Sequence, residues 1–162
     1  MIDRFLSDFS DPFASLEWEV AITRIAFSVL LGGLIGYERE AHTKPAGLRT
    51  HMLISLSACL FALIALDLMR MDADTPTQLR VDPLRLVEAV TAGVAFLAAG
   101  TIITGKNTVH GLTTGAGMWL AGAVGLACGT GSLTMACIAT VAALIILWLL
   151  RKLFMETHND NR

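Results

Sequence analysis

The sequence predicts an all-α membrane protein, a polytopic bundle of about five transmembrane helices. Hydrophobic residues make up 54% of the 162 residues and charged residues only 16%, whereas soluble domains carry about 25% charged residues. Five apolar segments also approach the ~20 residues that a helix needs to cross a bilayer. We therefore expect residues 1–162 to form a single membrane domain with short tails at both ends.

The expected spans follow one another with few residues between them. They are roughly residues 18–36, 48–66, 84–103, 112–128 and 133–150. Pro45 and Gly47 separate the first two spans, because proline and glycine interrupt helices. The one long connection, residues 67–83, is rich in turn formers and acidic residues. The fourth span is short and dense in glycine, so we expect a helix that is easily broken.

The basic residues predict the orientation of the bundle. If the N-terminus lies outside, the inner side holds seven of them, namely Arg39, Lys44, Arg49, Lys106, Arg151, Lys152 and Arg162. The outer side then holds four, namely Arg4, Arg70, Arg80 and Arg85. Cytoplasmic loops carry an excess of lysine and arginine. We therefore expect the N-terminus outside and the C-terminus in the cytoplasm.

Two opposite charges fall inside the expected spans. In this orientation Arg24 and Glu88 lie at similar depth, each four to six residues from the outer end of its span. A charge at the bilayer centre costs at least about 2.5 kcal/mol, so an ion pair between them lowers that cost. We hypothesise such a pair facing the bundle interior. The alternative is that Arg24 extends to the outer head groups and Glu88 is protonated or close to the interface.

The inner ends of the spans carry the most chemically varied residues. We expect an ionic cluster there, called the inner rim cluster, made of Glu38, Arg39, Arg49, Thr50, His51, Lys106 and His110. Glu38 and His42 also share a helix face and suggest a metal site, yet the surrounding basic residues disfavour a cation. A salt-bridged network that ties helix ends together and touches anionic lipid is the favoured interpretation. We expect no bound metal, no cofactor and no catalytic residue, because no nucleophile has an evident base beside it.

Residues 100–107 read G-T-I-I-T-G-K-N, which is close to a phosphate-binding loop. Asn107 replaces the required hydroxyl residue, and a membrane helix precedes the motif instead of a strand. The glycines predict close helix packing instead. We expect a packing corner between the third and fourth spans, formed by Gly111, Thr113, Thr114 and Trp119. The alternative is a solute or ion site at a break near Gly115 and Gly117.

Two blocks of sequence resemble the MgtC/SapB family of bacterial inner-membrane proteins. The first is GGLIGYERE with AGLRTHMLISLSACLF, residues 32–40 and 46–61, and the second is residues 91–131. The family pattern has glycine at Ala95 and Ala99 and arginine at His110, so the match is not complete. The resemblance implies five spans in a bacterial inner membrane, a periplasmic N-terminus and a cytoplasmic C-terminus. It also implies a connection to magnesium homeostasis. The chain ends at Arg162, and we expect a short form without the soluble C-terminal domain of longer members.

Two classes of function follow from these features. In the first, favoured interpretation, the protein is not an enzyme and modulates another membrane protein through its inner rim and its small-residue helix faces. In the second, an oligomer of the chain moves an ion or a small solute past Arg24, Glu88 and the fourth span. The expected partners are the lipid bilayer, another membrane protein and further copies of the chain. A net charge of −2 gives no electrostatic case for nucleic acid.

Overall fold

The computed structural model describes residues 16–42, 44–73, 82–104 and 108–159. Within these ranges the elements are α2 (Trp18–Glu40), α3 (Leu48–Ala73), α4 (Pro83–Gly100), β1 (Ile103–Thr104), β2 (Val109–His110), α5 (Leu112–Gly129) and α6 (Leu133–Asn159). Four of the helices, α2 to α5, are long and apolar enough to cross a membrane. The apolar part of α6, Leu133–Leu149, is shorter, although the whole helix has 27 residues. The prediction of an all-α membrane protein is confirmed.

The fourth and third spans differ in detail from the expectation. α5 is continuous over 18 residues, so it has no break near Gly115 and Gly117 of the kind that the alternative of a solute or ion site needs. α4 ends at Gly100 rather than near residue 103, because Ile103 pairs with His110 and Thr104 with Val109 in two short antiparallel strands. The hairpin was not expected from the sequence. It ends α4 and turns the chain directly into α5.

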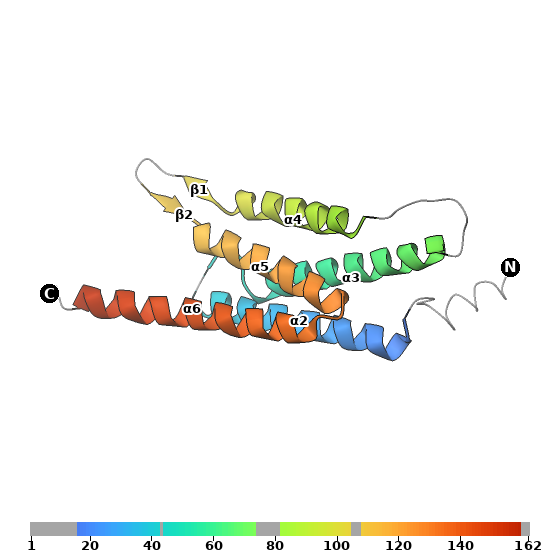
Figure 1. Ribbon diagram of the computed structural model, residues 1–162. Helices are drawn as coiled ribbons and strands as arrows, with labels where there is room; N and C mark the ends of the chain where they lie inside the picture. The colour runs from blue at the N-terminus through green and yellow to red at the C-terminus, as the bar shows by residue number, and fades with distance from the viewer. Residues whose placement is uncertain (1–15, 43, 74–81, 105–107, 160–162) are drawn as a thin grey trace.

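α5 is the central helix of the bundle. It contacts α2, α3, α4 and α6, whereas α4 packs mainly against α5 and α3 (Figure 1). The C-terminal end of α2, the hairpin and the N-terminal end of α5 lie together at one end of the bundle, called the strand end below (Figure 1). The N-terminal ends of α2 and α4 lie at the opposite end.

Local sequence signals account for two of the helix boundaries. At the start of α4 the Asp82 side chain accepts a hydrogen bond from the Leu84 amide at 2.9 Å, and Pro83 occupies the first helical position. Both are favoured at helix N-termini. At the end of α5, Gly131 has a φ of 88°, and the Ser132 amide donates to the Ala127 carbonyl at 2.8 Å. This left-handed residue turns the chain into α6.

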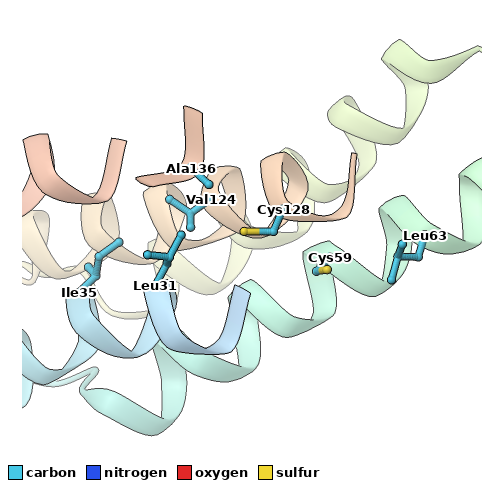
Figure 2. Packing of buried hydrophobic residues seen from close by; sticks show 7 residues of the cluster. All are labelled: Leu31, Ile35, Cys59, Leu63, Val124, Cys128 and Ala136. Carbon is cyan, nitrogen blue, oxygen red and sulfur yellow. The ribbon is translucent and has the colours of Figure 1, made fainter. Parts of the chain in front are cut away.

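The apolar core consists of two clusters of buried residues. The first joins α2, α3, α5 and α6 and contains Leu31, Ile35, Cys59, Leu63, Val124, Cys128 and Ala136 (Figure 2). The second joins α3, α4 and α5 and contains Ala46, Ile54, Ala58, Val90, Val94, Met118 and Ala121. All three cysteines are free, and Cys59 and Cys128 are buried as small apolar residues.

Candidate functional site

The backbones of α2 and α3 come close together near the strand end. A Cβ atom added at Gly32 would lie 2.6 Å from Ser55 Cβ, and one added at Gly36 would lie 2.8 Å from Leu48 Cα. Gly32 and Gly36 are four residues apart and therefore share one helix face. Because neither carries a side chain, α3 can bring His51 and Ser55 into the protein interior, where both are fully buried.

An ion pair closes the last turn of α2. Arg39 is only 5% exposed, and its Nε donates to Glu38 Oε2 at 2.6 Å. His42 Nδ1 lies 3.3 Å from Glu38 Oε1, one turn further along. A buried guanidinium needs a counter-ion of this kind, since an unpaired buried charge is costly. The local charges of Glu38 and Arg39 therefore balance.

His51 has one ring nitrogen with a partner and one without. Its Nδ1 lies 2.8 Å from the Gly47 carbonyl oxygen. A carbonyl oxygen only accepts, so Nδ1 carries the proton, and in the neutral ring Nε2 is then an acceptor. Nε2 is buried and has no hydrogen-bond partner within the described residues. It faces α5, because a Cβ atom added at Gly117 would lie 3.1 Å from it.

Two buried hydroxyl groups also lack partners within the described part of the chain, those of Ser55 and Thr114. Thr114 is 1% exposed and precedes Gly117 by three residues, so it shares the face of α5 that meets α3. Ser55 Oγ lies beside Gly32, on the α2 side of α3. The junction of α2, α3 and α5 is thus the polar interior of the protein.

Arg24 binds the end of a helix at the opposite end of the bundle. Its Nη1 donates to the Gly129 carbonyl oxygen at 2.7 Å. The guanidinium also covers the α5–α6 turn, since a Cβ atom added at Gly131 would lie 2.7 Å from Nη2. The last carbonyl groups of a helix lack intrahelical partners and carry partial negative charge, so a cation is stabilised there.

The same blocks of sequence that build this polar junction match known proteins. A family profile described as the MgtC family matches residues 25–155, which include most of α2, all of α3 to α5 and most of α6. The chain belongs to the MgtC family. No solved structure matches the chain.

Among relatives, the chain is 37% identical over 129 residues to a protein named Protein MgtC from Brucella abortus, covering 80% of this chain and 50% of that protein. It is 32% identical over 144 residues to the putative magnesium transporter YhiD of Escherichia coli, covering 86% of this chain and 65% of that protein. A protein of Haemophilus influenzae is 35% identical over 127 residues, which are 78% of this chain and 53% of the relative. The chain thus spans half to two thirds of the length of these relatives.

In this MgtC family member the inner rim cluster is only partly formed. Two of its expected members, Glu38 and Arg39, form an ion pair that His42 also approaches and that is mostly shielded from solvent. His51, on α3, lies outside the ionic cluster and is buried against α2 and α5. The sequence placed His51 at the start of a helix correctly, but it did not reveal which side of that helix is covered.

The other members of the inner rim cluster do not join that ion pair. Arg49 is exposed and Thr50 half-buried on α3, and His110 is exposed on β2. Within the described residues none of the three makes a hydrogen bond or an ion pair with Glu38 or Arg39. Successive helix positions turn by about 100°, so residues 49 to 51 point in different directions. Lys106 lies outside the described residues.

The predicted ion pair between Arg24 and Glu88 is wrong. Arg24 binds the end of α5 instead, and Glu88 is exposed on α4 without a hydrogen bond or ion pair among the described residues. Equal depth did not bring the two side chains together, because α4 packs mainly against α3 and α5 rather than α2.

The four residues of the predicted packing corner do not form one contact. Gly111 packs tightly between α4 and α5, whereas Thr113, Thr114 and Trp119 have different surroundings. Gly111 has a φ of 89°, and an added Cβ atom would lie 2.0 Å from the Thr101 carbonyl oxygen, so only glycine fits between α4 and α5. Trp119 lines a cavity of about 230 Å³ between the same two helices. Thr113 is exposed, and Thr114 is buried.

Small residues on α4 and α5 lie on several different faces of the two helices. On α5, Gly125 and Gly129 meet α3, while Gly122 meets Val94 of α4. On α4, Ala98 is buried and meets Gly115. Four other small residues of α4 are exposed, namely Ala89, Gly93, Ala95 and Ala99.

Sequence reasoning missed two polar groups of the junction. Ser55 follows His51 by one helical turn, and that spacing was the available signal. Glu40 Oε2 accepts a hydrogen bond from the Leu48 amide at 2.7 Å and so caps α3 across the Pro45–Gly47 turn. Among the described residues, no group of three or more His, Cys, Asp or Glu side chains could hold a metal ion.

Proposed function

We propose that this chain is a non-catalytic protein of a bacterial inner membrane that serves magnesium homeostasis by binding another membrane protein. The partner would dock on the exposed face of α4. The single observation that carries the proposal is Glu88, a carboxylate without a partner in the described structure, on the least buried of the candidate membrane helices.

α4 has room for a second helix. Only Val90, Val94 and Ala98 of this helix are buried, whereas Phe96 is 80% exposed. A Cβ atom added at Gly93 meets nothing within 4 Å. Helices associate in lipid through close packing at small residues rather than through the hydrophobic effect. The small residues of α4 would therefore allow close approach of a partner helix.

Glu88 gives the exposed surface of α4 a chemical preference. It lies five residues beyond Pro83, about 8 Å along the helix at 1.5 Å per residue. An ionisable side chain at such a depth is expensive in lipid and normally pairs with a basic or hydrogen-bonding group. Arg24 is already engaged by Gly129. A partner helix with a lysine, an arginine or an amide at matching depth would lower the cost.

The connection to magnesium rests on relatives. The resemblance to the MgtC/SapB family implies it, and the relative in Escherichia coli is named a putative magnesium transporter. Because this chain covers only 65% of that relative, a transport activity of the longer protein does not pass to this chain without a test.

Substitutions on α4 test the docking proposal. Gly93→Leu adds a side chain where the described structure has free space, so the fold should be kept while a partner helix is blocked. Glu88→Gln removes the charge. Ala142→Leu, at an exposed position of α6, is the matched control. In a strain that lacks the native protein, we expect the first two variants to fail to support growth at low magnesium, while the control succeeds.

Stability and transport measurements complete this test. None of the three variants should have a lower melting temperature in detergent than the unmodified protein, and Gly93→Leu should have a slightly higher one because leucine has a higher helix propensity than glycine. Normal growth with both α4 variants would contradict docking at α4. Purified protein in liposomes should carry no magnesium flux. A selective flux that Glu88→Gln abolishes would instead establish the transporter alternative.

A further inference from the structure

We propose that the junction of α3 and α5 contains a binding site for one ordered water molecule, held between His51 and Thr114 beside Arg39. The site is called the His51 site below. It lies inside the bundle and is separate from the α4 face, so it does not depend on the proposed docking of a partner. It rests on the buried polar atoms that have no partner within the described residues.

The first argument is the cost of the unpartnered atoms. His51 and Thr114 are 0% and 1% exposed, and both His51 Nε2 and Thr114 Oγ1 lack a hydrogen bond within the described residues. A buried polar atom without a partner costs about 1–3 kcal/mol. Buried waters in proteins typically make about three hydrogen bonds to atoms of this kind. Two such atoms on facing helices therefore indicate a bridging ligand.

The second argument is space. Gly117 has no side chain, and the position of an added Cβ atom would be 3.1 Å from His51 Nε2. Around that position the next atoms are Arg39 Cδ at 3.9 Å and His51 Cδ2 at 4.0 Å. Thr114 lies one turn earlier on the same face of α5. Gly117 thus leaves Nε2 without a side chain packed against it on the α5 side, where Thr114 is the nearest hydroxyl residue along the helix.

The charges around the site select a neutral ligand. Arg39 lies against the site and repels cations, while the lone pair of Nε2 repels anions. A water molecule donates one hydrogen to Nε2 and exchanges a second hydrogen bond with Thr114 Oγ1. Arg39 uses Nε and Nη2 for Glu38, so its Nη1 group is a further donor. The three partners together satisfy one water molecule.

Water-edited solid-state NMR of the protein in lipid tests this site directly. We expect the His51 ring signals to receive magnetisation from water several times faster than the methyl signals of Ile54 and Val124, which are buried and apolar. Gly117→Ala places a methyl group beside Nε2 and should remove this fast transfer. Gly93→Ala, at a position with free space, should leave it unchanged. Slow transfer to His51 in the unmodified protein would overturn the proposal.

A pair of threonine substitutions gives an independent thermal test. Thr114→Val removes the proposed water partner, while Thr140→Val removes a buried hydroxyl that already bonds to the Ala136 carbonyl at 2.9 Å. We expect Thr114→Val to lower the melting temperature by more degrees than Thr140→Val. If the Thr114 hydroxyl has no partner at all, its removal relieves a cost and raises the melting temperature. That result would contradict the water site.

Discussion

Arg24 shows how a charge at membrane depth can be satisfied without an opposite charge. Its guanidinium binds the Gly129 carbonyl at the C-terminal end of α5, where the helix dipole is negative. The contact links α2 to the α5–α6 turn, residues more than one hundred positions apart in the chain. Arg24 is therefore a structural residue of the turn, and Glu88 belongs to a different face of the protein.

We expect Arg24→Met to lower the free energy of unfolding by about 1.5–3 kcal/mol, the usual size of a hydrogen bond to a charged group. Arg49→Met, at an exposed position, is the control and should change it little. Chemical unfolding in detergent measures both.

The double variant Arg24→Met with Glu88→Gln distinguishes the observed contact of Arg24 with Gly129 from the hypothesised ion pair of Arg24 with Glu88. Because the two side chains do not touch, the effects should add to within about 0.5 kcal/mol. A recovery of stability in the double variant would show that the ion pair exists after all.

At the scale of elements, the glycines of α2 and α5 decide how the helices cross. A Cβ atom added at Gly125 would lie 2.1 Å from the Ser55 carbonyl oxygen, and one at Gly129 would lie 2.6 Å from Ala62 Cβ. α3 is therefore held between α2 and α5 at short distance. Gly122 of α5 also meets Val94 of α4, but Gly93 and Gly100 of α4 itself meet nothing within 4 Å.

The two kinds of glycine predict opposite effects of alanine. Gly125→Ala should destabilise the protein by at least about 2 kcal/mol, because a methyl group would overlap the α3 backbone. Gly93→Ala should stabilise α4 by about 0.5–1 kcal/mol through the higher helix propensity of alanine. Thermal unfolding of the two variants in the same detergent checks the contrast. Equal effects would mean that α3 and α5 are further apart than described.

At the scale of the whole molecule, the bundle has two chemically different ends. The strand end carries the Glu38–Arg39 ion pair and the exposed side chains of Arg49 and His110. The opposite end carries Arg24 on the α5–α6 turn. The count of basic residues in the sequence places the strand end in the cytoplasm, which is the orientation that we propose.

Single cysteines test this orientation. Glu40→Cys lies at the strand end, and Thr130→Cys lies on the α5–α6 turn; both positions are exposed. Cys59, Cys128 and Cys137 are changed to alanine or serine first. In intact cells whose outer membrane is permeable, an impermeant thiol reagent should label position 130 and spare position 40. The reverse pattern would show that the chain inserts the other way.

Much of the element order could be predicted from sequence, because each helix that crosses a bilayer must be long and apolar, and this can be recognised in each segment separately. The starts of α2, α3, α5 and α6 lie at the expected residues. Glu38 and Arg39 could be placed in one ionic cluster from the sequence, because they are neighbours in the chain, but their direct pairing was not predicted. The hairpin at β1 and β2 was not foreseen, since a two-residue strand has too little pattern to detect.

Sequence alone determined that this protein is an apolar helical bundle of the MgtC family with polar residues at its helix ends. Only the tertiary structure decided the partner of Arg24, the burial of His51 and the exposure of the small residues on α4. The physical reason is that span length and charge are properties of single segments. The rotation of each helix, by contrast, is set by close contacts between distant residues, such as Gly36 with Leu48 and Gly125 with Ser55.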